Sequence, residues 1–283
     1  MNVAIGENAM GANTTGFYNT AVGPLALEAN KTGQQNTAIG TTALYRNTKG
    51  AYNLAVGNAA LYSNTTGKYN TALGRRALIG LKTGNFNTAL GNEAGYNNVK
   101  GKGNVFIGHK AGYNEKGSYK LYIANTSTKK PLIYGDFLKK ALKVNGKMYA
   151  TKFITSSDER LKENIQPLSG ALSAVLQLQG KSYRLLDQPS GTNDIGLIAQ
   201  DVEKVLPEII SQTEDGYKAI AYQSLTAVLI EAIKEQQQQM TTQQAQLAAL
   251  EKENTHLKAI MAEQMETLLA RVAMLERIQV VAN

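Results

Sequence analysis

The chain has 283 residues, of which 43% are hydrophobic, and a formal net charge of +8. This length and composition indicate a folded protein of about one to three domains. It has no cysteine and two histidines, which excludes disulfides and cysteine or histidine metal clusters, so we expect neither cofactor nor metal. It has no apolar run of 18 residues and no N-terminal signal sequence, so we expect no membrane insertion.

Residues 1–117 are organised by a repeat of 17 residues. The pattern Asn-(Thr/Val/Leu)-(Ala/Phe)-(Ile/Val/Leu)-Gly recurs with this step, and a series of alanines and a second series of glycines keep it too. The three series are Asn2, Asn19, Asn36, Asn53, Asn70, Asn87 and Asn104; Ala9, Ala26, Ala43, Ala60, Ala77, Ala94 and Ala111; and Gly16, Gly33, Gly50, Gly67, Gly84 and Gly101. This period predicts one coil of a parallel β-solenoid, with two strands of about five residues per coil.

Each class of residue in the repeat has an expected place. Glycines mark the turns because they tolerate positive φ, and the asparagines form a hydrogen-bonded ladder. Alanine and the aliphatic residues fill a narrow interior. Four aromatic residues precede the motif asparagine and form a row, which serves either for stacking, which we favour, or as a carbohydrate-facing strip. These residues are Tyr18, Tyr52, Tyr69 and Phe86.

Most of the positive charge lies in the repeat. Residues 1–117 contain eleven lysines and arginines against four glutamates, one or two basic residues per repeat. This scattered arrangement is typical of a solvated outer face rather than of a phosphate-binding stripe. We therefore expect no nucleic-acid partner.

The repeat resembles the head repeats of trimeric autotransporter adhesins and the NTAxG repeats of bacterial tail-fibre-domain proteins. The resemblance covers residues 2–117 and implies three parallel solenoids packed side by side in a homotrimer. Because a repeat motif begins directly after Met1, we expect the chain to be a piece of a longer fibre.

Residues 118–155 read as a β-rich neck. Short β-prone runs occur at 119–123 and 132–134, and the run 142–149 has Asn145-Gly146 at its centre. Asn-Gly between alternating residues is a strong hairpin signal, so we expect a hairpin there.

Residues 156–224 follow an α+β pattern. We expect a helix over 172–178, an extended segment over 182–186, a buried strand over 195–198 and a helix over 200–206 that ends before Pro207. A turn at Glu214-Asp215-Gly216 then predicts a hairpin whose second strand is 217–222.

Three motifs in this region carry a strong resemblance to a known family. Ser157-Asp158-x-Arg160-Leu161-Lys162, Gly196-Leu197-Ile198-Ala199-Gln200-Asp201-Val202 and Asp215-Gly216-Tyr217 occur in order before a long helix. This resembles the intramolecular chaperone domain of phage endosialidases and other tailspikes.

The resemblance implies a domain that assembles the trimeric fibre and then releases itself. It implies cleavage of the Ser156–Ser157 bond, with Ser157 as nucleophile and Lys162 as general base. Asp158 either orients this pair or supports a backbone turn. Two residues five apart lie about 140° apart around a helix, so Ser157 must sit on non-helical backbone to meet Lys162.

Lys162 must also lose its proton to act as a base. Its reference pKa near 10.4 would have to fall by about 3 units, worth roughly 4 kcal/mol, through burial on trimer formation or through the nearby charge of Arg160. The same residues read without the resemblance fit a capping box, in which Ser156 and Glu159 open a short helix and the others are solvated.

Residues 225–283 read as a coiled-coil helix that continues to about residue 278. No glycine or proline interrupts it, and an apolar seam recurs at steps of four and three, which predicts a parallel coiled coil. The fibre resemblance favours a trimer. Beyond Met261 the seam slips by a four-residue stutter. Up to there it comprises Leu229, Ile233, Gln236, Met240, Gln243, Leu247, Leu250, Asn254, Leu257 and Met261.

The sequence thus predicts a segment of a tail fibre, tailspike or surface adhesin, on the virion tail or outside the cell, that contacts a glycan or protein receptor. Three alternatives stay open: the end of a polysaccharide-degrading tailspike, a trimerisation module that does not cleave, and a membrane-released transcription factor. A glycosidase needs two carboxylates across a cleft, and residues 1–117 contain no aspartate, so a glycan enzyme would have to lie upstream. The solenoid, in place of a DNA-binding fold, argues against the transcription factor.

Overall fold

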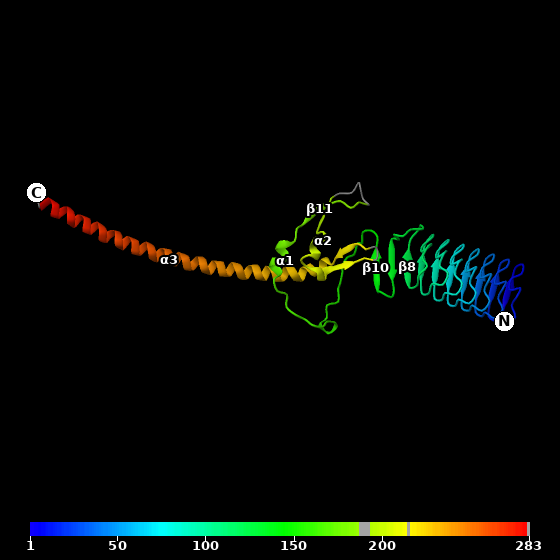
Figure 1. Cartoon of the computed structure of the whole chain (residues 1–283). Coiled ribbons are helices and arrows are strands. Elements are labelled where there is room, and N and C mark those ends of the chain that lie inside the picture. The colour runs from blue at the N-terminus through cyan, green and yellow to red at the C-terminus, as the bar shows by residue number, and fades with distance from the viewer. Residues whose placement is uncertain (187–192, 214–215, 282–283) are drawn as a thin grey trace. The chain divides into compact units, whose positions relative to one another are not determined.

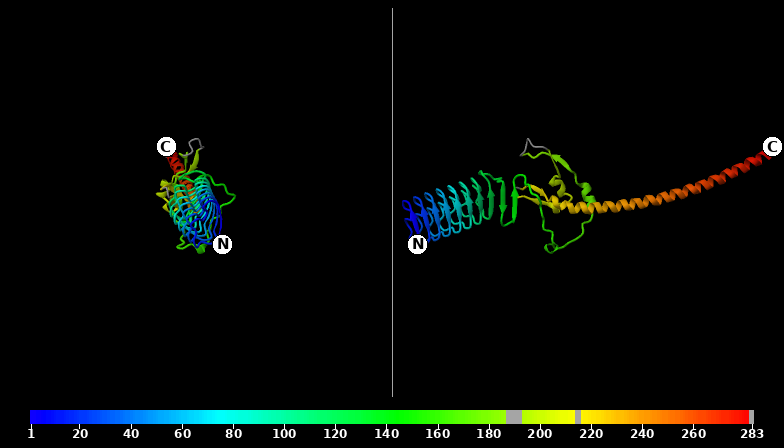
Figure 2. Two further views of the ribbon diagram at one scale, coloured as in Figure 1. Left: turned by 90° about the vertical axis from the view of Figure 1, so that its right-hand side faces the viewer. Right: turned by 180° about the vertical axis from the view of Figure 1, so that it is seen from behind.

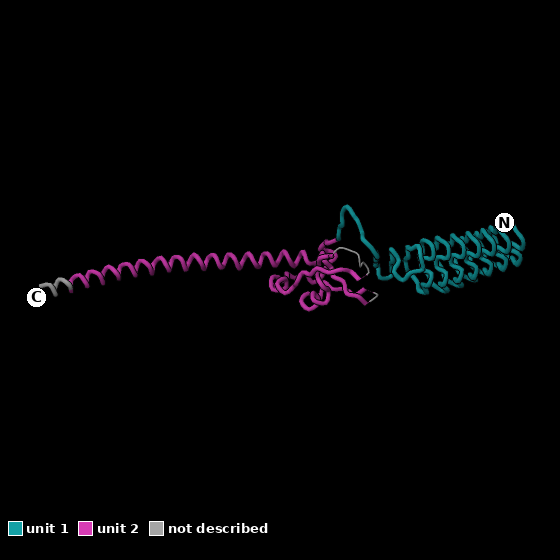
Figure 3. The backbone as a smooth tube through the Cα atoms, turned by 90° about the horizontal axis from the view of Figure 1, so that it is seen from above, with its two compact units in different colours: residues 1–155 teal, residues 156–283 magenta. Residues whose placement is uncertain are grey.

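The structure is a computed structural model that describes residues 1–186, 193–213 and 216–281. It divides into two compact units, Met1–Thr155 and Ser156–Asn283 (Figure 3). The first unit is all β and the second is α+β with one long helix (Figure 1). The predicted mixed fold, with an N-terminal parallel β-solenoid and a long C-terminal helix, is confirmed.

The first unit is a stack of seven coils whose strands form one parallel ladder (Figure 1). Each strand pairs with the strand 17 residues further along, as in Ala21 with Ala38. The prediction of two five-residue strands per coil is wrong, because each coil has one strand of three residues and the rest is turns. The strands are β1 Val3–Ile5, β2 Thr20–Val22, β3 Thr37–Ile39, β4 Leu54–Val56, β5 Thr71–Leu73, β6 Thr88–Leu90 and β7 Val105–Ile107.

The turns are built largely by non-glycine residues in the left-handed region. Leu44 and Leu61 both have φ of 51°, and both are fully buried. Left-handed backbone is costly for a leucine, so burial of its side chain in the core has to hold it there. These residues replace the second strand of each coil.

The core of the solenoid is narrow and consists mainly of alanine and leucine. The central alanine of each strand, such as Ala38, and the alanine series, such as Ala43, are fully buried. The expected burial of the aliphatic motif residues is wrong: Ile39, Leu73 and Leu90 are 40%, 43% and 45% exposed. Successive residues of a strand point to opposite sides, so an inward alanine places both of its neighbours outside.

Two files of asparagines run along the inside of the coils. In the first file, the backbone N–H of Asn53 donates to Oδ1 of Asn36 at 3.1 Å, and Nδ2 of Asn53 donates to the carbonyl of Gly67 at 2.8 Å. In the second file, Nδ2 of Asn47 donates to Oδ1 of Asn30 at 2.8 Å. The first file confirms the predicted ladder, whereas the second was not anticipated.

The second file is interrupted once. Leu81 occupies the place of an asparagine and is fully buried. A leucine has no donor, and Oδ1 of Asn64, one coil before it, has no hydrogen-bond partner within the part of the chain that the structure describes. The interrupted file therefore leaves one buried acceptor unpaired.

Glycine is required at two kinds of position for two different reasons. Gly57 ends its strand with φ of 130°, and an added Cβ would lie 2.6 Å from the carbonyl oxygen of Gly74. Gly50 belongs to the series expected to need positive φ, but its φ lies outside that range. There an added Cβ would lie 2.6 Å from the oxygen of Gly67. Close approach of the next coil, not backbone conformation, selects glycine in the second series.

The expected aromatic row is a stack. The ring centroids of Tyr52 and Tyr69 lie 4.8 Å apart, and those of Tyr69 and Phe86 lie 5.1 Å apart, with nearly parallel planes. Tyr18 instead meets Phe17 edge to face. Because the rings cover one another's faces, the row exposes mainly edges, which favours the stacking interpretation over a sugar platform. Two further stacked pairs, Tyr45 with Tyr62 and Tyr96 with Tyr113, were not predicted.

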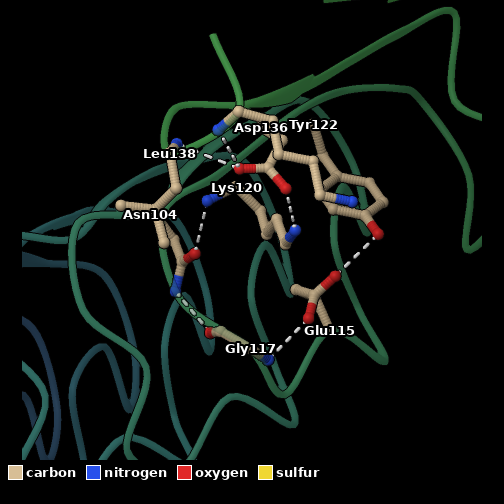
Figure 4. Close-up of polar contacts among 8 residues, drawn as sticks. Asn104, Glu115, Gly117, Lys120, Tyr122, Asp136 and Leu138 are labelled. Atoms are coloured by element: carbon tan, nitrogen blue, oxygen red, sulfur yellow. Dashed lines mark hydrogen bonds and ion pairs between the residues drawn. The ribbon is translucent and has the colours of Figure 1, made fainter. Parts of the chain in front are cut away.

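The neck continues the same sheet. Strand β8 (Lys120–Ile123) pairs parallel with β7, and β9 (Ile133–Asp136) and β10 (Ala141–Val144) follow as antiparallel strands. The predicted hairpin at Asn145-Gly146 is wrong, since β10 ends just before it and the turn lies at 137–140. The Asp136 carboxylate stabilises that turn by accepting the backbone N–H groups of Leu138 and Lys139 (Figure 4).

A buried ion pair closes this end of the sheet. Nζ of Lys120 lies 2.6 Å from Oδ2 of Asp136, whose residue is only 4% exposed (Figure 4). The ammonium of Lys120 and the two N–H groups of the turn lower the pKa of Asp136 to about 2. The same pair raises the pKa of Lys120. Asp136 therefore stays ionised and joins β8 to β9.

The second unit has small sheets and short helices at the base of a long helix (Figure 2). The helix predicted over 172–178 is present at Ala171–Gln177, and the helix predicted over 200–206 is present but shorter, at Ala199–Glu203. The extended segment predicted over 182–186 is a strand at Lys181–Tyr183, and the predicted hairpin is also present. Residues 214–215 of its predicted turn lie outside the described residues. The strand predicted over 195–198 is present at Asp194–Gly196, but its predicted burial is wrong, because Ile195 is 86% exposed. The elements are 3₁₀ turns η1 Glu159–Leu161, η2 Pro207–Ile209 and η3 Tyr222–Ser224; helices α1 Ala171–Gln177, α2 Ala199–Glu203 and α3 Leu225–Val281; and strands β11 Lys181–Tyr183, β12 Asp194–Gly196, β13 Ile210–Gln212 and β14 Lys218–Ile220.

Over residues 225–275, helix α3 is buried only near its start. Val228 and Ala232 pack against Ala171 of α1, whereas seam residues such as Leu247 and Met261 are 59% and 68% exposed. Within the described ranges, none of the helices combines the length and apolar character needed to cross a membrane.

The interrupted asparagine file gives a matched pair of variants. Asn47 and Asn64 each donate to the preceding rung and to a glycine carbonyl, but only Oδ1 of Asn47 also accepts a bond, from Asn64 at 2.8 Å. We expect Asn47→Ala to destabilise the solenoid by about 1–3 kcal/mol more than Asn64→Ala, because a buried hydrogen bond is lost in addition. Urea unfolding of both variants measures the difference, and equal costs would contradict it.

Candidate catalytic site

The predicted catalytic segment lies on exposed, irregular backbone. Ser156, Ser157 and Asp158 precede the 3₁₀ turn η1, and Lys162 follows it. Nζ of Lys162 donates a hydrogen bond to Oγ of Ser157 at 2.7 Å. The structure therefore brings the proposed nucleophile and the proposed base into direct contact within one chain.

The local fold explains how residues five apart meet. Lys162 has extended backbone with φ of −126° and ψ of 150°, and Ser157 lies before the turn. The backbone of Asp158 before the turn and of Lys162 after it is extended, so the segment does not continue as a helix that would keep residues five apart on different sides. The geometric requirement of non-helical backbone at Ser157 is therefore met.

Asp158 maintains the turn and does not contact the Ser–Lys pair through its side chain. Its carboxylate accepts the backbone N–H of Arg160 at 2.9 Å, as an N-cap. The guanidinium of Arg160 donates to both carboxylate oxygens, at 3.0 and 2.7 Å. The predicted capping box of Ser156 and Glu159 is absent, because Asp158 occupies the cap position.

The Asp158–Arg160 pair also sets the local electrostatics. The guanidinium lowers the pKa of the Asp158 carboxyl, and the carboxylate raises the pKa of Arg160. The charge of Arg160 is thus balanced by its neighbour, which weakens the expectation that it acts on Lys162. Burial is then the remaining way to favour a neutral amine at Lys162, but residues 156–162 are exposed in the single chain.

The motif at residues 196–202 makes structural contacts within the second unit and does not contact the Ser–Lys pair in the hydrogen bonds of the described residues. An added Cβ on Gly196 would lie 2.8 Å from Oη of Tyr222 and 3.0 Å from Oη of Tyr183, so two tyrosines require glycine there. The backbone N–H of Leu197 donates to Oη of Tyr222 at 2.9 Å. This contact ties the motif to the residues just before helix α3.

Asp201 of the same motif links the sheet to helix α2. Its carboxylate lies 2.8 Å from Nζ of Lys181 on β11 and 3.2 Å from Nζ of Lys204. The two ammonium groups lower the pKa of the Asp201 carboxyl. Asp201 therefore links strand β11 to helix α2.

Helix α3 holds helix α1 through a residue that the sequence analysis did not single out. The carboxylate of Glu235 accepts the backbone N–H groups of Ala171 and Leu172 at 3.0 and 2.8 Å. Gly170, the N-cap of α1, has no side chain to do this. A helix that begins after a glycine lacks a side-chain cap, so an acidic residue beside the seam of helix α3 could have been predicted to cap it.

The described residues contain no group of three or more histidine, cysteine, aspartate or glutamate side chains placed to hold a metal ion. The chemistry that the site offers is that of a serine hydroxyl beside a lysine amine. The chain thus combines a stacked β-solenoid, an exposed Ser–Lys contact and a long helix with an exposed apolar seam.

Comparison with known proteins identifies this segment. Residues 157–211 match the family model of the chaperone of endosialidase, peptidase S74. The predicted recognition of this domain is confirmed, and the match begins at Ser157.

Curated relatives are phage tail fibre proteins. The long tail fiber proteins Gp37 of Enterobacteria phages K3 and T2 are each 36% identical to the chain over 103 residues, which is 32% of this chain. That of Enterobacteria phage M1 is 38% identical over 92 residues, which is 30% of this chain. The matched part spans 8% of the K3 and T2 proteins and 37% of the M1 protein.

We expect Glu235→Gln to loosen helix α1, because one amide oxygen replaces two carboxylate oxygens that accept two N–H groups. The two N–H bonds lower the pKa of Glu235 below its ordinary 4.5. Its stabilising effect is therefore fully present above pH 4.5 and is lost as the pH falls through the lower folded value. Amide hydrogen exchange over 171–177 should accelerate in the variant.

Glu231→Gln on the same helix is the control, since its carboxylate pairs with Lys234, at 2.7 Å, and with no other cation among the described residues. Equal exchange over 171–177 in both variants would contradict the anchoring role of Glu235.

Proposed function

We propose that this chain is a segment of a homotrimeric phage tail fibre whose C-terminal unit drives trimer assembly and then cuts itself off between Ser156 and Ser157. The observation that carries the proposal is the 2.7 Å contact between Oγ of Ser157 and Nζ of Lys162, at the first residue of the chaperone match. The tail fibre relatives support a place in the virion tail.

Two exposed apolar surfaces support self-association. The outer side of the parallel ladder exposes aliphatic side chains in register, and the seam of helix α3 exposes Leu247, Leu250 and Leu257 at 59%, 57% and 48%. Such surfaces are normally covered in soluble proteins. The outer side of the ladder comprises Val3, Ile5, Ile39, Leu54, Leu73 and Leu90, each at least 39% exposed.

The proposed reaction uses the serine and the lysine of one chain. Neutral Lys162 takes the proton of the Ser157 hydroxyl, and Oγ attacks the carbonyl carbon of Ser156. The C–N bond breaks and the amine of Ser157 takes up a proton, which leaves an ester between Ser156 and the Ser157 side chain. Water then hydrolyses this ester, so the fibre ends at Ser156 and the released unit begins at Ser157.

Assembly is the proposed trigger. In the single chain the Ser–Lys segment is exposed, and Lys162 donates to Ser157 rather than accepting from it. A base role requires a neutral amine, which is favoured when a lysine is removed from water. Cover from neighbouring chains of the trimer would supply that removal, so cleavage would follow correct assembly. The mature fibre would then contact a glycan or protein receptor on the cell surface.

The cleavage prediction concerns three variants. We expect the wild-type trimer to yield two fragments, whereas Ser157→Ala and Lys162→Ala stay full length, with a rate at least about 10²-fold lower. Lys162→Arg should also stay full length, because arginine keeps the charge but does not deprotonate. Denaturing electrophoresis and fragment masses measure the outcome.

Ser156→Ala is the matched control and should be cleaved, because its hydroxyl has no role in the proposed reaction. Cleavage of Ser157→Ala at the same bond would refute the role of the serine. A wild type that never cleaves as a trimer would make this unit a trimerisation module only.

The assembly prediction concerns the helix seam. We expect the full chain to sediment as a trimer and Leu247→Asp to weaken that trimer by about 10²-fold or more, because a charge would be buried in the seam. Ala249→Asp, two positions away and outside the seam, should leave it unchanged. A stable wild-type monomer or dimer would overturn the proposed assembly.

A further inference from the structure

One edge of the solenoid collects most of its lysines. Each of the first six coils has a glycine of the second series in a turn, Gly117 takes this place in the seventh coil, and the lysines within two positions of these glycines are exposed. From the second to the seventh coil, each coil has at least one lysine there. These residues form the lysine edge: Lys31, Lys49, Lys68, Lys82, Lys100, Lys102 and Lys116.

Backbone hydrogen bonds show that these positions stack directly on one another. The N–H of Lys31 donates to the carbonyl of Thr48 at 3.0 Å, Thr48 to Thr65 at 2.9 Å, and Thr65 to Lys82 at 2.8 Å. Each step is 17 residues, so Lys31 and Lys82 share this column, with threonines between them. Lys49, Lys100 and Lys116 directly precede the turn glycine of their coils, and Lys68 and Lys102 directly follow it. The seven lysines therefore form a strip a few residues wide that runs along the solenoid axis. The rise between neighbouring coils is about 4.8 Å.

The charges of the lysine edge are not used inside the protein. All seven lysines are exposed, and within residues 1–117, every one of which is described, none of them forms an ion pair. Glu115, the acid nearest to this edge in the repeat, is occupied by the N–H of Gly117 and the hydroxyl of Tyr122 (Figure 4). Glu93 instead pairs on the opposite turn, with Arg75, Arg76 and Lys110.

We propose that the lysine edge binds an anionic polysaccharide that lies along the solenoid axis. A strip of exposed cations, next to which the only acid, Glu115, is already hydrogen-bonded within residues 1–122, matches a linear polyanion by charge. A polymer with one acidic group per sugar ring has a charge spacing close to the rise of one coil. Exposed threonines beside the lysines, Thr32, Thr66 and Thr83, offer hydroxyl groups to the sugar hydroxyls.

A nucleic acid fits this edge less well. Single-stranded nucleic acid is held by bases that stack on free aromatic faces, and the faces of Tyr52, Tyr69 and Phe86 largely cover one another. Duplex DNA carries one charge per about 1.7 Å of its axis, much denser than one lysine row per coil.

The inference specifies the receptor class of the proposed fibre, and it rests on that function but not on self-cleavage. The test uses the full-length chain and measures binding of polygalacturonate at about 0.1 M salt by calorimetry, with neutral dextran and an oligo(dT) strand as competing ligands. Sedimentation of each sample reports the trimer separately.

We expect polygalacturonate to bind and dextran not to bind. The triple variant Lys49→Gln, Lys68→Gln, Lys82→Gln should weaken binding about 10-fold or more, because three contacts with the polymer are lost. The triple variant Arg75→Gln, Arg76→Gln, Lys110→Gln, which removes the same charge from the cluster around Glu93, should weaken it less than about 3-fold.

Three results would overturn the inference. If the chain sediments as a trimer but does not bind polygalacturonate, the glycan site is refuted, whereas the proposed fibre function still stands. Equal losses in both triple variants show a general charge effect rather than a site. Tighter binding of oligo(dT) than of polygalacturonate assigns the edge to nucleic acid.

Discussion

Stacking of identical coils in register is the constraint on which the rest of the first unit depends. Backbone N–H groups and asparagine amides pair each coil with the next at a step of 17 residues, as in Asn36 with Asn53. The pairing works only if successive coils approach closely, which excludes a Cβ at Gly50 and Gly57. Once the coils are in register, any residue type repeated at one position becomes a continuous feature of the surface. The aliphatic outer strands and the stacked rings arise in this way, and lysines at neighbouring repeat positions gather into the lysine edge.

The sequence predicts the solenoid well because its strongest signals are periodic. Asparagine, alanine and glycine recur where buried amides, small core side chains and close coil contacts require them. The sequence does not reveal the turns, since residues such as Leu44 take left-handed backbone without a glycine to mark it. The Asn145-Gly146 signal fails because Asp136 organises an earlier turn, a preference that depends on its pairing with Lys120.

The candidate site is predictable in its residues but not in its geometry. The Ser157–Lys162 spacing is neutral in a sequence, and the turn that brings them together depends on the cap that Asp158 forms with Arg160. Glu235 was missed because its partners are backbone groups of a distant helix. The cover that a lysine base requires is not visible in a single chain, because it would come from other copies.

Leu81 affects how strongly the solenoid resists twisting at one interface between coils. In a linear array each coil is held only by its neighbours, so stability is a sum over successive interfaces. At the interface between Asn64 and Leu81, a directional amide bond is replaced by apolar contact, which holds no particular alignment. There the two coils are aligned by the first asparagine file and by backbone hydrogen bonds, such as that from the N–H of Thr65 to the carbonyl of Lys82 at 2.8 Å. This interface therefore has one asparagine hydrogen bond fewer than the interface before it, and under torsion we expect the solenoid to twist there first.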